Sequence, residues 1–365
     1  MGGLRMAGSP PDDADDARWF ASDTFTQGLD AAQKMDLPLD AYLSWPWPDL
    51  DAMMGAMAPG QVHYVAGASN IGKTPFTISF VDRCLDRDHK VYVIPTELGA
   101  GDWRIQHVCH RVGVNPKEVV NGALKARAKA GDLEAAALRK RLNETMHELT
   151  VLHGPWGQRL YVSDLDTLTG NDVYAAIREA KAFGAKVVLI DHVDKLRDRR
   201  NVFQSAGDVA DAMLDGAKDH GMIVVGTTQL NREAIKGDHL ARFSPPRADM
   251  VLYGEVKYQN ATSMVGLFRR LRERTAQEPI SRDAQGKRVD PFAELVKQAR
   301  AGAVPAVDVL WPNITGVVAM KARFDGEIGK RCYLGFDRGR IVDLPDAERR
   351  ALDAATNGIR TGDAG

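Results

Sequence analysis

The sequence predicts an α/β fold built on a mostly parallel, twisted sheet that is flanked by helices. Short runs rich in β-branched residues alternate with helix-length segments between residues 61 and 229. Alternation at this spacing implies βαβ units, in which helices connect parallel strands. A glycine-rich turn follows the first run, and later runs end on polar residues. In such sheets, binding sites form at the carboxyl ends of the strands.

The individual elements can be placed from the same patterns. We expect strands at 61–66, 90–97, 160–162, 186–191, 222–229 and 263–268, with an antiparallel pair at 316–321 and 331–336 ending the sheet. Helical patterns cover 99–113, 123–149, 171–183, a charged loop and helix at 195–219, and a helix near 291–300.

These elements predict one large domain with two short flanking segments. Residues 1–17 are rich in Gly, Pro, Ala and Asp, and we expect a disordered acidic tip there. Residues 18–43 could form one short helix, a candidate oligomerisation linker. The α/β domain is predicted over 44–345 with an insertion at about 270–312, and 346–365 forms a short charged helix and tail.

Composition limits the classes of protein that remain. The chain has 365 residues, of which 44% are hydrophobic and 27% charged, as in ordinary globular proteins. Its net charge is -1, so any contact with nucleic acid must come from local basic loops. Three cysteines without a C-x-x-C spacing argue against a zinc ribbon or a disulfide framework. Without a long apolar run or a leader pattern, we expect a cytoplasmic protein.

The glycine-rich turn matches the pattern G-x-x-x-x-G-K-[ST] between a predicted strand and a predicted helix. Backbone N–H groups of such a loop hold phosphate oxygens, and the helix N-terminus adds its positive dipole end. Lysine reaches the β- and γ-phosphates, and the hydroxyl can ligate Mg²⁺. The sequence therefore predicts a nucleoside triphosphate site at Gly67, Ala68, Ser69, Asn70, Ile71, Gly72, Lys73 and Thr74.

Polar residues at the ends of other strands can complete this site. Asp191 closes an apolar strand, where an acid that coordinates Mg²⁺ belongs. Glu97 can polarise the water that attacks the γ-phosphate, and the Gln229 amide can contact that phosphate and report its loss. Lys321 and Arg323 share one face of a strand and can stabilise charge on the transferring phosphate. A strand cap or a solvated surface residue is the structural alternative for each.

Taken together, these motifs resemble the ATPase domain of the hexameric DnaB-like replicative helicases, within the RecA-like superfamily. The resemblance extends from Trp47 to about Asp343. Asp191-His192 and the segment 320–326 are especially similar to the helicase half of phage primase-helicases. The family's landmarks occur in its order: the loop at 67–74, Thr96-Glu97-Leu98, Asn121-Gly122, residues 160–164, Ile190-Asp191-His192, residues 228–233, Lys321-Ala322-Arg323 and residues 334–337.

The resemblance implies a RecA-like P-loop fold, ATP and Mg²⁺ as cofactors, and a homo-oligomer of hexameric type on single-stranded DNA. Arg323, with Lys321, would be a finger inserted into the adjacent subunit's ATP site. Docking of a primase or a helicase loader would be supplied by other chains or be absent. We expect this protein in the host cytoplasm if a phage encodes it. Basic residues of two loops would contact DNA: Lys195, Arg197, Arg199, Arg200, Arg232, Lys236 and Lys257.

One departure from the family pattern leaves other functions open. The segment 254–263 matches the family's G-x-[IL]-x-Q-x-[AS]-D pattern only loosely, because Gln259 is shifted by one position and the acid is replaced. The first alternative is a RecA-like recombinase or recombination mediator that coats DNA as a filament. The second is a nucleotide-switched oligomeric scaffold that does not unwind DNA.

Overall fold

The computed structural model describes residues 37–150, 158–198, 200–232, 236, 238–271, 281–282, 285–311, 313–322, 327–337 and 340–345. The chain divides into two compact units, Met1–Leu43 and Ser44–Gly365. In the first unit the described residues contain a single 3-10 turn, Leu39–Ala41. Most of the predicted linker helix and all of the predicted C-terminal tail lie outside the described residues.

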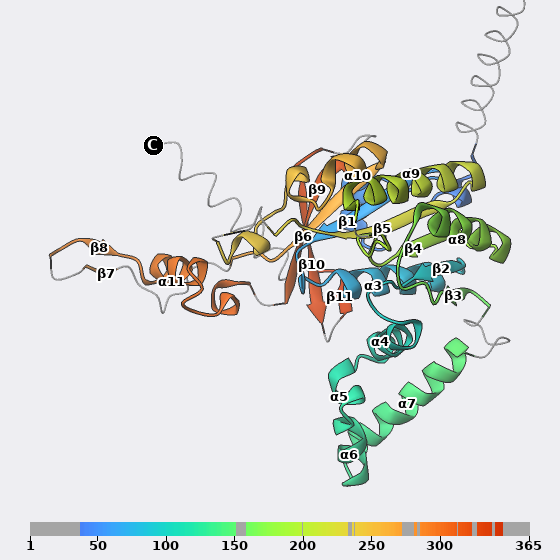
Figure 1. Ribbon diagram of the computed structural model, residues 1–365. Coiled ribbons are helices and arrows are strands. Elements are labelled where there is room, and N and C mark those ends of the chain that lie inside the picture. The colour runs from blue at the N-terminus through green and yellow to red at the C-terminus, as the bar shows by residue number, and fades with distance from the viewer. Residues whose placement is uncertain are drawn as a thin grey trace, which may run out of the picture. The chain divides into compact units, whose positions relative to one another are not determined.

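The described part of the second unit is built on a nine-stranded sheet with the order β11-β10-β9-β6-β1-β5-β4-β2-β3 (Figure 1). Neighbouring strands from β6 to β3 in this order run parallel, whereas β9, β10 and β11 are antiparallel to their neighbours. The predicted parallel sheet with its antiparallel C-terminal strands is therefore confirmed. The strands are β1 (Val62–Gly67), β2 (Val91–Ile94), β3 (Leu160–Val162), β4 (Val187–Ile190), β5 (Ile223–Gln229), β6 (Ser263–Phe268), β9 (Ile314–Ala322), β10 (Arg331–Asp337) and β11 (Arg340–Val342).

Helices cover both faces of the sheet. Figure 1 shows α8, α9 and α10 on one face and α3 and α4 on the other. Strands β1, β2 and β4 are consequently buried at every position, which explains their continuous apolar sequence. None of the described helices has the length and apolar character that a membrane span requires. The helices are α2 (Pro48–Met54), α3 (Lys73–Asp86), α4 (Ala100–Val112), α5 (Pro116–Val120), α6 (Ala123–Lys129), α7 (Leu133–Thr150), α8 (Gly170–Phe183), α9 (Val202–His220), α10 (Gly254–Asn260) and α11 (Pro291–Arg300).

Three predicted elements differ from the structure. The single helix expected at 123–149 is two helices, α6 and α7, separated at Gly131, whose φ of 94° is incompatible with a continuing helix. Strand β2 ends at Ile94, because Pro95 cannot donate to the sheet, so Glu97 lies beyond the strand. The insertion contains a short antiparallel pair, β7 (Ser281–Arg282) and β8 (Arg288–Val289), in addition to the expected helix α11.

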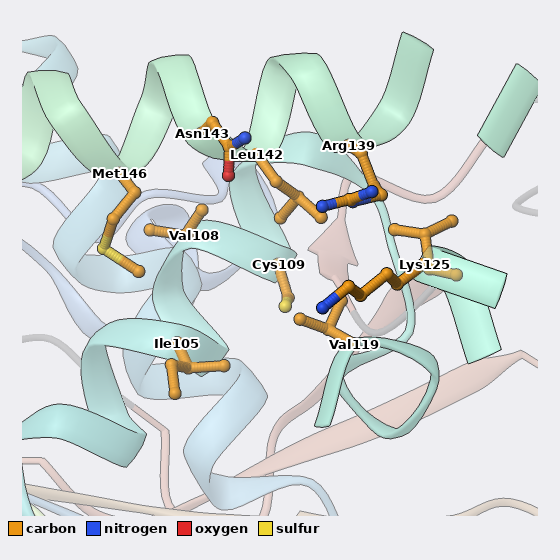
Figure 2. Close-up of a pocket in the computed structure, with 10 residues that line it drawn as sticks. Ile105, Val108, Cys109, Val119, Lys125, Arg139, Leu142, Asn143 and Met146 are labelled. Atoms are coloured by element: carbon orange, nitrogen blue, oxygen red, sulfur yellow. The ribbon is translucent and has the colours of Figure 1, made fainter. Parts of the chain in front are cut away.

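Helices α4 to α7 form a helical branch that carries a half-open pocket of about 260 Å³. Figure 2 shows Val108 and Cys109 of α4 and Leu142 and Met146 of α7 among the side chains that line it. Burial raises the pKa of Cys109 to about 11, so the thiol stays protonated at neutral pH. The described lining contains none of the residues predicted to hold a nucleotide. This pocket is therefore separate from the predicted site.

A buried carboxylate joins α3 to α4. Asp82 accepts hydrogen bonds from His107 (2.6 Å), His110 (2.7 Å) and Arg111 (2.6 Å). The far nitrogen of His110 lies 2.8 Å from the Ser79 hydroxyl. Burial alone would raise the pKa of Asp82, but attraction to His107, the two histidine hydrogen bonds and Arg111 together hold it well below its usual value. The helix that follows the phosphate loop is thus fixed to the helical branch by an ionic network.

Candidate nucleotide-binding site

The glycine-rich loop joins the end of β1 to the start of α3, as predicted. Asn70 (φ 62°) and Gly72 (φ 108°) adopt left-handed backbone conformations, which turn successive N–H groups inward. A Cβ on Gly67 would lie 2.7 Å from the Ile71 side chain, so only glycine fits there. The local geometry therefore forms a cradle for an anion at the N-terminus of a helix.

Lys73 lies within this cradle and is only 7% exposed. Its ammonium donates to the carbonyl oxygens of Gly67 and Ala68, both at 2.9 Å. Burial lowers the pKa of Lys73, while the carboxylates of Asp191, Glu97 and Asp194 oppose this shift. A cation in this position attracts phosphate oxygens that enter the loop.

Asp191 follows β4 directly and is 3% exposed. Thr227 donates to its Oδ1 at 2.6 Å, and Thr77 donates to its Oδ2 at 3.4 Å. Burial raises the pKa of Asp191, and hydrogen bonds from Thr227 and Thr74 and the charge of His192 oppose that effect. The structure thus brings Asp191 together with Thr74, as the sequence predicted.

The residues around Asp191 suit Mg²⁺. The nearby polar atoms are carboxylate and hydroxyl oxygens, which are the metal ligands that this hard cation prefers. No group of three or more His, Cys, Asp or Glu among the described residues could hold a metal alone. Mg²⁺ needs no such group beside a nucleotide, because it binds through one or two protein oxygens, substrate phosphates and water. Thr74 and Asp191 are the residues that would hold it.

Glu97 is held beside Asp191 by the backbone. Its N–H donates to the carbonyl oxygen of Asp191 at 3.2 Å, although its own side chain is 52% exposed. The preceding residue, Thr96, is buried, and its hydroxyl donates to the His192 carbonyl at 2.7 Å and accepts the His192 N–H at 2.9 Å. This clamp fixes the base of the Glu97 side chain while leaving its carboxylate at the surface.

Gln229 ends β5 and lies opposite Gly67 in the parallel register. Its amide nitrogen is 3.3 Å from Nε2 of His192, and this imidazole nitrogen lies 3.9 Å from the Glu97 carboxylate. The His192 imidazole therefore lies between the Glu97 carboxylate and the Gln229 amide, the two groups predicted to act at the γ-phosphate. Sequence reasoning gave His192 no role of its own, although it directly follows Asp191.

Lys321 lies away from this site, towards the amino ends of the parallel strands. In the register, Lys321 of β9 pairs with Met264, which pairs with Tyr64 near the start of β1. The level of Gly67 is three residues further on, about 10 Å along the strand direction. The Lys321 ammonium donates to the carbonyls of Tyr258 and, at 3.5 Å, Gln259. The second predicted finger residue, Arg323, lies outside the described residues.

The residues predicted to contact DNA divide into two groups. Arg197, Arg200, Arg232 and Lys236 are exposed and Lys195 is half-buried, while Arg199 lies outside the described residues. Lys257 corrects the prediction, because its side chain is 2% exposed and its ammonium is bonded to Asp194, Thr228 and Leu252. A lysine buried in this way has no surface to offer a DNA strand. Sequence reasoning did not identify Asp194, and it did not foresee that Lys257 pairs with Asp194 next to the site.

Comparisons with known proteins bear on the fold and the family of the chain. The family model described as the DnaB-like helicase C terminal domain matches residues 43–315. One solved ATPase domain has a TM-score of 0.60 and 16% sequence identity, and the match covers 92% of this chain and 100% of that chain. A second solved structure has a TM-score of 0.60 and 17% sequence identity. It is described as a DnaB-like replicative helicase and its interactions with primase.

The second structure is longer than this chain. The match covers 83% of this chain and spans 63% of that helicase. A search with the sequence among curated proteins found no match. At identities this low the two structures establish a shared fold, and the family model extends over most of the second unit. The chain therefore belongs to the family of DnaB-like helicase C-terminal domains.

Proposed function

We propose that this chain is an ATP- and Mg²⁺-dependent, ring-forming DNA helicase motor, which translocates on single-stranded DNA in replication and hydrolyses ATP at subunit interfaces. The observation that carries the proposal is the separation, along the strand direction, between Lys321 and the carboxyl ends of the parallel strands. Lys73, Asp191 and Gln229 lie at those carboxyl ends, and Lys321 lies about 10 Å towards the amino ends.

Each residue at these carboxyl ends has a chemical task in ATP hydrolysis. The N–H groups of the loop and the Lys73 ammonium would hold the phosphates, and Thr74 and Asp191 would hold Mg²⁺, which would supply positive charge against the phosphates. Glu97 orients the attacking water and accepts its proton. Gln229 contacts the γ-phosphate and moves when that phosphate leaves.

The position of Lys321 supports a site that is shared between subunits. A side chain about 10 Å from the level of the loop, on a strand two positions away, cannot reach a phosphate bound at its own Gly67. The same cation can reach a nucleotide held by an adjacent subunit. Arg323, two residues further along the chain, is the proposed finger.

Single-stranded DNA is the proposed track. Arg197, Arg200, Arg232 and Lys236 are exposed in the loops that follow Asp191 and Gln229. Basic side chains on such loops can hold a phosphate backbone without reading sequence. Because these loops leave the strands that end in Asp191 and Gln229, a change at the nucleotide can be passed to the DNA.

The decisive experiment measures ATP hydrolysis with and without single-stranded DNA, together with the mass of the protein in ATP. We expect DNA to increase turnover several-fold and the protein to form a closed ring. Hydrolysis that is indifferent to DNA would favour a nucleotide-switched scaffold. Open helical polymers on DNA would favour a recombinase.

Mixing an Arg323→Ala variant with a Lys73→Ala variant tests the shared site. Each variant alone should be nearly inactive, but in a mixed ring a Lys73→Ala subunit can supply its intact Arg323 to the intact phosphate loop of an Arg323→Ala neighbour, so part of the turnover should return. Arginine fingers contribute roughly 10³-fold or more to turnover. Arg331→Ala, an exposed arginine on the adjacent strand β10, is the matched control. A mixture that stays as inactive as the two variants alone would remove the shared finger from the proposal.

A further inference from the structure

A buried ion pair lies beside Gln229, the residue predicted to contact the γ-phosphate. Asp194, in the segment between β4 and α9, and Lys257, in α10, have side chains that are 3% and 2% exposed. They come from positions 63 residues apart in the chain, and they bond to one another. Burying two charges carries a large desolvation cost, which this pair must offset through further hydrogen bonds.

The Lys257 ammonium uses all of its N–H groups in hydrogen bonds. Besides Asp194, its ammonium donates to the Thr228 hydroxyl at 2.8 Å and to the Leu252 carbonyl at 2.6 Å. An ammonium has three N–H groups, so every donor has an acceptor. The Tyr253 ring lies 5.4 Å from the ammonium. Lys257 thus fixes its three acceptors relative to one another.

Asp194 connects this hydrogen-bonded group to the backbone of Gln229. Its Oδ2 accepts the Gln229 backbone N–H at 2.8 Å and the Thr228 hydroxyl at 3.0 Å. On the other side of the residue, the Gln229 carbonyl accepts the Leu252 N–H at 2.8 Å. The backbone of Gln229 is therefore held from both sides by groups that Lys257 connects.

We propose that Asp194 and Lys257 are positioning residues, which act on ATP hydrolysis through Gln229. The proposal rests on the function proposed above for the nucleotide site. Both side chains bond to the backbone and side chains around Gln229, so their effect on catalysis is indirect. Removing the ammonium leaves the Asp194 carboxylate buried without its counter-charge, and the backbone that presents the Gln229 amide loses its fixed position.

A double-mutant cycle tests this assignment. ATP hydrolysis is measured with oligo(dT) for the parent, Lys257→Met, Gln229→Ala and the combined variant. We expect Lys257→Met to lower kcat by about tenfold or more and to change KM by less than about threefold. In the Gln229→Ala background the same substitution should lower kcat by less than about twofold, because residues that act through one another are not additive.

Controls separate positioning from stability and from the proposed function. Circular dichroism and titration with a fluorescent ATP analogue give kcat per folded, nucleotide-binding subunit, and Lys297→Met, an exposed lysine of α11, is the matched control. Asp194→Asn, which keeps an oxygen acceptor, provides a second variant. Equal losses of kcat in both backgrounds, unchanged kcat, or failure of both variants to fold would overturn the proposal. Turnover by the parent tests the function of the site separately.

Discussion

Replacing Glu97 by glutamine is expected to lower ATP turnover by roughly 10²- to 10⁴-fold, the usual contribution of a positioned general base. The substitution keeps the size and the backbone clamp of the residue, and the carboxylate is half exposed, so folding should be unaffected. Nucleotide affinity should stay close to that of the parent, because the phosphate loop is unchanged. Steady-state hydrolysis and binding of a fluorescent ATP analogue check the two statements independently.

Lys73→Ala supplies the contrast. Its ammonium lies in the loop itself, so the variant should lose both affinity and turnover. Glu118→Gln, a half-buried acid of α5 that pairs with Arg127 on the surface, controls for the loss of a carboxylate elsewhere. If Lys73→Ala and Glu97→Gln hydrolyse ATP as fast as the parent, the assignment of the site is wrong.

The largest effect on stability is expected at Asp82. Replacing it by asparagine removes the charge that pairs with His107, His110 and Arg111, and breaking one partner of a buried ionic network typically costs about 3 kcal/mol of unfolding free energy. Arg83→Ala, one residue further along α3, breaks a pair with Asp343 whose side chains are 47% and 46% exposed, so it should cost less than about 1 kcal/mol. Denaturant unfolding measures both values.

The pH dependence of this difference has a definite sign. The folded-state pKa of Asp82 lies below its unfolded value, which is about 3.9 for aspartate. Its ionised form therefore stabilises the protein fully at pH values above the unfolded pKa, and this contribution is lost as the pH falls towards the folded pKa. The gap between the parent and Asp82→Asn should be largest at about pH 5 and above and shrink below about pH 4. A gap that widened on acidification would contradict the ionic account.

The sequence allowed the strand ends of the site to be predicted because their signals are local. A loop motif fixes Gly67 to Thr74, and an apolar run that closes on an acid identifies Asp191. Parallel pairing then places Gln229 opposite Gly67 without further information. The parallel character of the sheet follows from the same alternation of strands and helices.

Residues that depend on distant partners could not be predicted in this way. Lys257 lies in a polar, basic stretch of the sequence, which predicts a solvated cation. In the structure it is buried, because it pairs with Asp194, 63 residues away. Asp82 likewise resembles an ordinary helical acid until α4 brings His107 and His110 against it. Only the folded chain shows which charges face one another.

Helix α10 has a consequence for how neighbouring nucleotide sites of an assembled ring could influence one another. Lys257 bonds one side of this seven-residue helix to Thr228 and to Asp194, which accepts the Gln229 backbone N–H, and the carbonyls of Tyr258 and Gln259 accept from Lys321 of β9. A helix of this length spans about 10 Å, and its hydrogen-bonded backbone moves as one body. If subunits assemble as proposed, two neighbouring sites share this single part. The free energy of filling one site would then depend on whether its neighbour is filled, so the two sites would not bind nucleotide independently.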